Sequence, residues 1–187
     1  MAIGDLSGFR HLAALMQNLL TTLLARARRQ SGHRPIKLGR VDASTALLCA
    51  WAGFQPAALD KRLDITVQTQ VGAHVRADPD VLEMVLSNLL DNATSYAPIA
   101  GQIELSAMPD GDHVAIAIGS TTDTITADDL PHLFEPFWRK GTDRTGGSHS
   151  GLGLSLVAAV VSMMEGEIQA LLNQPGWIRF VVTLPSA

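Results

Sequence analysis

SNLLDNATSYAP, residues 87–98, is the stretch that decides the fold of this chain. It lies inside an apolar pattern whose spacing predicts the buried face of an α-helix. The pattern consists of Val81, Leu82, Val85, Leu86, Leu89, Leu90 and Ala93. Asn88 and Asn92 share one face of this helix, beside the buried one. Asparagine is unfavourable inside a helix because its amide competes for backbone partners. A carboxamide oxygen is, however, a ligand that suits Mg²⁺, so the stretch predicts a metal–nucleotide site.

Length and composition bound the class of protein. The chain has 187 residues, 47% of them hydrophobic, and a net charge of −4, which suits one globular domain with an appendage. This charge balance gives no basic signature, so we expect no nucleic-acid partner. The single cysteine, Cys49, excludes a disulfide framework and fits a reducing compartment. We interpret it as a small core residue. No apolar run reaches the ~18–20 residues that a membrane span needs, and no signal peptide is visible.

Residues 6–29 are predicted to form one long helix. Leu12, Met16, Leu19 and Leu23 recur at heptad-like spacing, so this helix must pack on a partner helix or on the domain itself. The segment SGHRP, residues 31–35, contains the glycine and proline that stop a helix. We therefore predict a helical appendage over 1–32 and a separate domain over 33–187.

The rest of the chain predicts strands alternating with helices. Asp42 is expected to cap a helix that runs to about residue 58, and Asp78 and Pro79 to open the asparagine helix. Further helices are expected at 127–133 and 151–164, with a long polar loop over 135–150. Strands are expected at 36–38, 63–69, 74–76, 102–108, 113–118, 167–172 and 177–184. This order predicts a two-layer α/β (α+β) sandwich, with a mixed, mostly antiparallel sheet and helices on one face.

A second informative stretch is GGSHSGLGLSL, residues 146–156. This glycine-rich loop leads directly into a helix, where exposed amide N–H groups can bind phosphate. Its sequence is neither a P-loop, because no Gly-Lys-Ser/Thr follows, nor a dinucleotide fingerprint, because no strand precedes it. A plain flexible loop is the alternative interpretation.

Three motifs in order resemble the catalytic domain of sensor histidine kinases. These motifs are Asn88-x-x-x-Asn92-Ala93, LFEPFWR over 133–139 and SGLGL over 150–154. They resemble the N box, the F box and the distal glycine box of that domain. It belongs to the superfamily of gyrase, the Hsp90 chaperones and MutL, and the resemblance covers residues 42–185. The helix over 6–29 resembles the second helix of the kinase dimerisation hairpin.

The resemblance implies a Mg²⁺–ATP site and assigns roles within it. Asn92 would ligate Mg²⁺, and Asn88 would support the metal or a phosphate. Tyr96 would lie near the adenine, although an ordinary tyrosine at the edge of the core is an equal alternative. Phe134 and Phe137 would anchor the two halves of an ATP lid. By the same resemblance, the phosphate-binding group would be Arg139, Lys140, Ser150, Gly151, Leu152, Gly153 and Leu154, with Arg139 preferred among the cations.

Asn88 also distinguishes the type of reaction. The ATP-hydrolysing members of the superfamily place a glutamate at this position as the general base for water, so its absence favours phosphoryl transfer to a protein side chain. We expect transfer from ATP to a histidine that is absent from this chain, with no catalytic residue within it. The phosphoryl group would then pass to a response regulator. We expect the full-length protein to form a homodimer. We expect the part given by this sequence to be cytoplasmic, and we leave open whether the full-length protein is anchored in the bacterial inner membrane.

The match is incomplete at two places. The family's proximal glycine box reads Asp/Asn-x-Gly-x-Gly, but here Ser120 stands for the adenine-reading residue, and Thr122 and Thr124 stand for the glycines. Asp123 is a possible substitute acid. No histidine is followed by the acidic residue that the acceptor requires. These departures keep two alternatives open: a degenerate docking module of the same fold that does not bind ATP, and a serine kinase of the anti-sigma-factor type.

Overall fold

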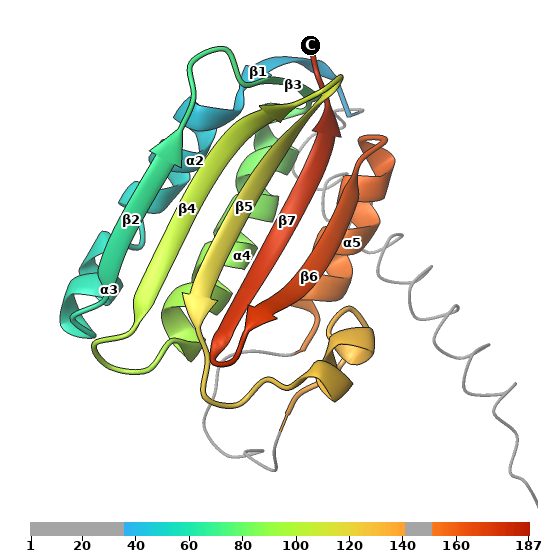
Figure 1. The fold of residues 1–187 in the computed structure, drawn as a ribbon. Coiled ribbons are helices and arrows are strands. Elements are labelled where there is room, and N and C mark those ends of the chain that lie inside the picture. The colour runs from blue at the N-terminus through green and yellow to red at the C-terminus, as the bar shows by residue number, and fades with distance from the viewer. Residues whose placement is uncertain (1–35, 141–150) are drawn as a thin grey trace, which may run out of the picture. The chain divides into compact units, whose positions relative to one another are not determined.

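The computed structural model describes residues 36–140 and 151–187, and Lys37–Ala187 form one compact unit. Helix and strand labels follow Figure 1. The predicted helix over 6–29 and the domain boundary after residue 32 lie outside the described residues and stay predictions. Among the described residues, no helix combines the length and the apolarity that crossing a bilayer demands.

A five-stranded sheet is the centre of the fold, in the order β2-β4-β5-β7-β6. Its strands are β2 (Asp64–Thr69), β4 (Gln102–Asp110), β5 (His113–Thr121), β6 (Glu167–Gln174) and β7 (Trp177–Pro185). The pair β2–β4 is parallel and the other pairs are antiparallel. A second sheet pairs β1 (Gly39–Asp42) with β3 (His74–Ala77) in antiparallel register. The prediction of a mixed, mostly antiparallel sheet is confirmed.

The helices cover one face of this sheet (Figure 1). They are α2 (Ala43–Ala52), α3 (Gln55–Asp60), α4 (Pro79–Tyr96) and α5 (Gly153–Met163), with a short 3₁₀-helix, η1 (Ala127–His132). All seven apolar residues of the predicted α4 face are buried. Burying each leucine of that face contributes roughly 1.5–3 kcal/mol, so α4 forms the middle of the core.

Two local predictions on the first helices are wrong. The helix expected to run to about residue 58 ends at Ala52 and a second one begins at Gln55, because Pro56 has no N–H to continue the hydrogen bonds of α2 but is tolerated in the first turn of a new helix. Cys49 is exposed rather than buried. The buried residues of α2 are Ala43, Leu47 and Trp51, which repeat every four residues and leave Cys49 on the other side of the helix.

The strand predictions differ from the structure mainly at their ends. The first strand is Gly39–Asp42 rather than 36–38, and Asp42 caps α2 by accepting a hydrogen bond from the Thr45 N–H at 2.7 Å. That bond lowers the pKa of the Asp42 carboxyl. β4 extends two residues beyond the prediction, up to the turn at Gly111 and Asp112, and β5 extends three residues at its other end, where it pairs with β7.

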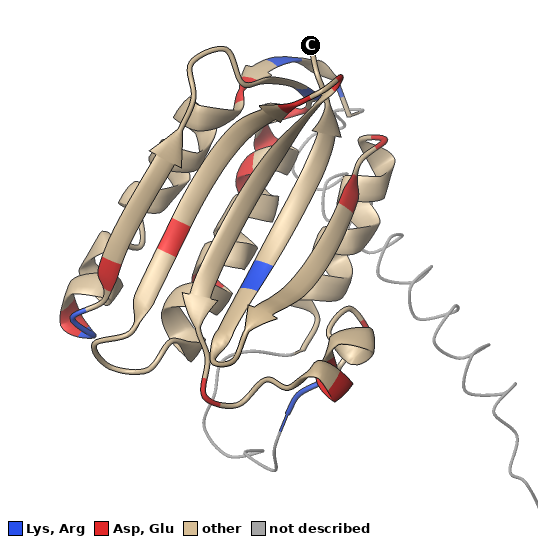
Figure 2. Ribbon diagram, in the orientation of Figure 1, with Lys and Arg blue, Asp and Glu red and all other residues tan. Residues whose placement is uncertain are grey.

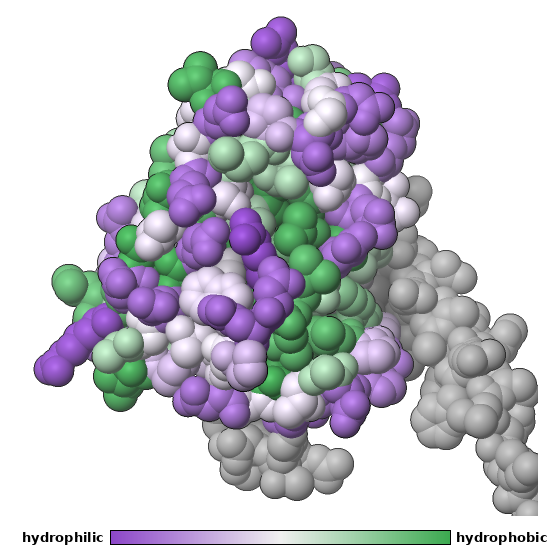
Figure 3. Space-filling view, in the orientation of Figure 1, coloured by the Kyte–Doolittle hydropathy of each residue, from purple (hydrophilic) through white to green (hydrophobic). Residues whose placement is uncertain are grey.

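No helix of the described residues covers the other face of the sheet (Figure 1). Charged residues are sparse along the central strands of the sheet (Figure 2). Arg179 on β7 reaches across β5 to Glu104 on β4 (3.5 Å) and donates to Ser106 Oγ (3.0 Å). Figure 3 shows this face, with hydrophobic side chains gathered along β7 and β6 and hydrophilic ones around them.

Candidate functional site

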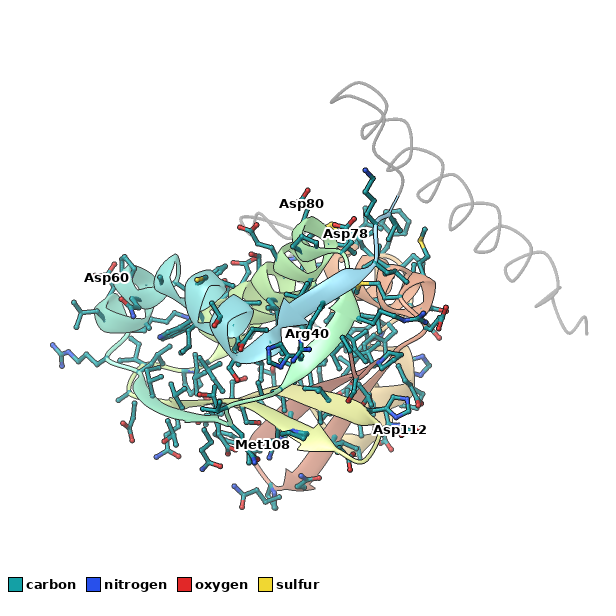
Figure 4. The ribbon with its side chains drawn as sticks, turned by 90° about the horizontal axis from the view of Figure 1, so that it is seen from above. Arg40, Asp60, Asp78, Asp80, Met108 and Asp112 are labelled. Atoms are coloured by element: carbon teal, nitrogen blue, oxygen red, sulfur yellow. The ribbon has the colours of Figure 1, made fainter. Side chains whose placement is uncertain are left out.

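The start of α4 is held by Asp78. Its Oδ1 accepts hydrogen bonds from the N–H groups of Asp80 (3.1 Å) and Val81 (3.4 Å), and its Oδ2 accepts one from the Lys37 N–H (2.8 Å). Asp78 is buried at the point where α4 begins, beside β1 (Figure 4). Pro79 follows as the first helical residue. These contacts confirm the predicted cap and fix the rotation of α4, and with it the direction of both asparagines.

Asn88 faces the start of α5. Its Nδ2 donates a hydrogen bond to the Met84 carbonyl at 2.8 Å, which satisfies the amide within the helix. This bond aims Oδ1 away from α4, and a β-carbon built on Gly153 would lie 2.9 Å from that oxygen. A β-carbon at position 153 would force the Asn88 carboxamide to shift, so the second glycine of the Gly-Leu-Gly motif and the first asparagine meet in space.

Asn92 is half-buried one turn further along α4. In the described part of the chain, no hydrogen-bond partner is found for its carboxamide. Its oxygen is therefore available to a ligand on the same side of α4 as Asn88. Tyr96, one turn later, is 55% exposed at the end of the helix, which fits a surface for a ligand or the edge of the core equally well.

No side chain of the described residues caps the N-terminus of α5. Leu152 stands at the N-cap, Gly153 is the first helical residue and Leu154 follows. The free N–H groups and the positive end of the helix dipole suit an anion. The Ser155 hydroxyl donates instead to the Leu152 carbonyl at 2.9 Å.

The F box is joined to the glycine box by backbone contacts. The Phe137 N–H donates to the Gly151 carbonyl at 2.9 Å, and a β-carbon on Gly151 would lie 2.9 Å from the Phe137 Cα. Both residues have positive φ, 72° at Gly151 and 65° at Phe137. A bulky residue adopts this conformation at a cost. Phe134 is anchored by an edge-to-face contact with Phe180 on β7, with ring centroids 6.3 Å apart.

The end of β5 carries the residues that replace the proximal glycine box. Ser120 is buried, and it lies on the side of β5 that also carries Ile116 and Ile118, all facing the helices. Asp123 is exposed beyond the strand end, so the structure does not bring it together with Ser120.

Thr122 and Thr124 both lack positive φ, so this turn needs no glycine. Thr122 is buried, and its Oγ1 accepts hydrogen bonds from the N–H groups of Thr124 (3.4 Å) and Ile125 (3.3 Å). Its own N–H donates to the Gly176 carbonyl at 2.9 Å. Sequence reasoning missed this role of Thr122, although a threonine hydroxyl that bonds the backbone two residues ahead is a known turn signal.

The two cations after the F box have different surroundings. Lys140 forms an ion pair with Asp129, and its Nζ also donates to Thr126 Oγ1 at 3.2 Å. Arg139 is exposed and takes part in an interaction. Lys140 hydrogen-bonds to Asp129 and, with the Thr126 N–H, lowers the Asp129 pKa to about 2. Nothing in the sequence motif had indicated Asp129.

The donor set of the site is neutral oxygen and amide N–H. Over 36–140 and 151–187, no three His, Cys, Asp or Glu side chains gather into a metal-binding group. A Mg²⁺ ion here would thus depend on carboxamide oxygens together with the oxygens of a bound phosphate, a combination that this ion accepts. Of the predicted residues, Asn88 is brought to Gly153 and Phe137 to Gly151, while Ser150 lies outside the described residues.

Comparisons with known proteins agree with this geometry. Residues 77–187 match the family described as histidine kinase-, DNA gyrase B-, and HSP90-like ATPase. The sensor protein CreC of Escherichia coli is 33% identical over 165 residues, which cover 88% of this chain and 34% of CreC. The chain therefore spans about a third of the length of that relative.

Solved structures share the fold. The catalytic domain of histidine kinase ThkA matches with a TM-score of 0.70 at 20% identity, over 80% of this chain and 95% of that domain. A structure of ThkA in complex with the response regulator protein TrrA matches with a TM-score of 0.70 at 17% identity, over 100% of this chain and 53% of ThkA. With three motifs joined at one site and a family match over most of the compact unit, this chain belongs to the histidine kinase-, DNA gyrase B-, and HSP90-like ATPase family, as an ATP-binding catalytic domain of the sensor histidine kinase type.

Proposed function

We propose that this domain binds Mg²⁺–ATP between α4, the start of α5 and the F box, and that it supplies the γ-phosphoryl group for a histidine elsewhere in the full-length protein. The observation that carries the proposal is the approach of Asn88 Oδ1 to Gly153. It places a carboxamide oxygen beside the uncapped N–H groups of a helix, so that a cation ligand and an anion site adjoin.

Each part of the site has a role in this proposal. The N–H groups of Gly153 and Leu154 would donate to phosphate oxygens, and Gly151 would let the backbone approach them closely. Asn92 would ligate Mg²⁺, with Asn88 beside it. The bound ion would neutralise charge on the phosphate oxygens, which is its usual contribution to phosphoryl transfer. These residues thus position and neutralise the group that is transferred.

The adenine would be read at the end of β5. Ser120 is buried on the helix-facing side, where its hydroxyl would take the place of the family's carboxylate or amide. A hydroxyl forms a weaker hydrogen bond than a carboxylate, so we expect modest affinity for the base. Tyr96 and Asp123 would lie at the margin of this pocket, the first near the base and the second open to solvent.

Transfer to a side chain is favoured over hydrolysis. Asn88 stands where a general base would be needed to activate water, and its amide is engaged with Met84. The acceptor would be a histidine of the dimerisation hairpin in the full-length protein, and the helix over 6–29 would contribute to that homodimer. A response regulator would receive the phosphoryl group, as the reported complex of ThkA with TrrA suggests for a partner of this type.

A second function, a docking module that does not bind ATP, is favoured by one observation. Thr122 builds the turn after β5 with its own hydroxyl, so this end of the site is assembled without the family's glycines. The two functions differ in one measurable property, the affinity for a nucleotide.

Isothermal titration with Mg²⁺ and a non-hydrolysable ATP analogue tests the proposal. We expect binding in the micromolar to millimolar range and its loss in Asn92→Ala. Gln68→Ala is the matched control, because Gln68 is an exposed amide on the edge strand β2. If the folded wild-type domain gives no heat of binding at millimolar nucleotide, the proposed function is wrong and the docking module is the function that remains.

A further inference from the structure

Asp129 collects three hydrogen bonds on one carboxylate oxygen. Its Oδ2 accepts from the N–H and the hydroxyl of Thr126, both at 2.7 Å, and from the ammonium of Lys140. The Asp129 side chain is 15% exposed and that of Lys140 34% exposed. The two bonds to Thr126 cap η1 and hold the carboxylate in place, so Lys140 meets a fixed partner rather than a mobile surface charge.

The same contact connects η1 to the nucleotide site. Lys140 follows Phe137 by three residues, and the Phe137 N–H is bonded to the Gly151 carbonyl. Gly151 precedes Gly153, which meets Asn88. The contacts at Asp129, Gly151 and Gly153, joined by the short segments 137–140 and 151–153, therefore connect η1 through the F box to the glycine box and α4. Movement of Lys140 away from Asp129 would loosen the F-box backbone where Phe137 is held at positive φ.

We propose that Asp129 is a positioning residue of the nucleotide site, which binds Lys140 and so holds the F box against Gly151. This inference rests on the proposed function. It differs from the role that the sequence motif implies for Lys140, which is direct contact with a phosphate. In the structure the Lys140 ammonium binds Asp129 and Thr126. In our proposal, Lys140 therefore acts by positioning the backbone of the F box.

The experiment compares Asp129→Asn, Lys140→Met, the double variant and Lys140→Arg by titration with three ligands. These are Mg²⁺–AMPPNP, Mg²⁺–ADP and adenosine. Asp128→Asn is the matched control, because Asp128 is an exposed neighbour with the same charge. Loss of the pair should weaken all three ligands by a similar factor, roughly two- to fivefold, the range of a single ion pair. The double variant should be no weaker than either single one, and Lys140→Arg should bind like the wild type.

Two results would overturn the proposal. If Lys140→Met weakens AMPPNP but not adenosine, while Asp129→Asn leaves AMPPNP unchanged or tighter, then Lys140 is a phosphate ligand. If all variants bind as the wild type does, the pair is an ordinary surface contact.

Amide hydrogen exchange on the nucleotide-free protein separates this inference from the proposed function. Asp129→Asn should speed exchange of the Phe137 N–H, and Asp128→Asn should not. A wild-type domain that binds no nucleotide would refute the proposed function, and the exchange rates would then decide whether the pair holds the F box. Unchanged exchange at Phe137 in Asp129→Asn would refute the positioning role whether or not nucleotide binds.

Discussion

The Oδ1 atom of Asn88 lies 2.9 Å from the place where a β-carbon would stand on Gly153. These residues are 65 positions apart in the sequence, and their approach joins the asparagine helix α4 to the start of α5. Because the Asn88 amide is bonded to Met84, the oxygen cannot turn away without breaking that bond. A β-carbon at position 153 would therefore displace the Asn88 carboxamide and disturb its bond to Met84.

Gly153→Ala is expected to impair nucleotide binding and spare the fold. The new methyl group would displace the Asn88 carboxamide, while alanine is a better helix residue than glycine. We expect a loss of about 10- to 100-fold in affinity for Mg²⁺–AMPPNP, the range found for partners of metal ligands. Gly39→Ala is the control, since a β-carbon there meets nothing within 4 Å. Wild-type affinity in Gly153→Ala would contradict the proposed geometry.

Asn92→Ala should separate binding from stability. The described residues give the Asn92 carboxamide no hydrogen bond to lose, and alanine exceeds asparagine in helix propensity by up to about 0.7 kcal/mol. Urea denaturation should show an unchanged or slightly raised free energy of unfolding. The affinity of the variant for AMPPNP should be lower than that of the wild type in Mg²⁺. It should also be the same in Mg²⁺ as in EDTA. A variant that retains the wild-type response to Mg²⁺ would exclude Asn92 as the ligand.

Thr122→Val should destabilise the domain by about 1–3 kcal/mol. The substitution keeps the shape of the side chain but removes the hydroxyl that accepts two backbone N–H groups in a buried turn. Thr122→Ser keeps that hydroxyl and is the control, with a smaller loss. Chemical denaturation monitors both variants. Equal free energies of unfolding for the two would show that the hydroxyl does not stabilise the turn.

Ala100→Gly is expected to stabilise the domain by up to about 1 kcal/mol. Ala100 is exposed and has a φ of 57°, a conformation that glycine adopts without steric cost. Ala52→Gly, at the exposed end of α2, provides the contrast, because glycine in a helical position destabilises by about 0.5–1 kcal/mol. A lower thermal midpoint in Ala100→Gly would contradict the expectation.

Asp129 should make the stability of the domain depend on acid pH. The Lys140 ammonium holds the pKa of the Asp129 carboxyl at about 2, below its ordinary value of 3.8. A lowered pKa in the folded state stabilises the protein above the unfolded pKa, and this stabilisation is lost as the pH falls from about 4 to about 2. Asp129→Asn should flatten the acid-unfolding profile over that interval. A profile that Asp129→Asn and Asp128→Asn alter equally would contradict this assignment.

The sequence could predict the elements whose signals are local. The apolar face of α4 follows from residue spacing, and its start follows from Asp78 and Pro79, because a cap and a proline act on adjacent backbone. The ends of strands were less predictable, as β4 and β5 show, because strand length depends on pairing with a neighbour. Pro56 indicates a break after Ala52. The prediction of one continuous helix followed the apolar pattern of α2 instead of this proline.

The sequence by itself determined the motifs, their order and the family resemblance, since residue type and spacing are local properties of the chain. Only the tertiary structure decided what each motif contacts. It brings Asn88 to Gly153 and Phe137 to Gly151, commits Lys140 to Asp129, exposes Cys49 and Asp123, and gives Thr122 the turn that glycines would otherwise make. Such contacts join residues far apart in the sequence, and the packing of α4 and α5 against one sheet sets the distances between them.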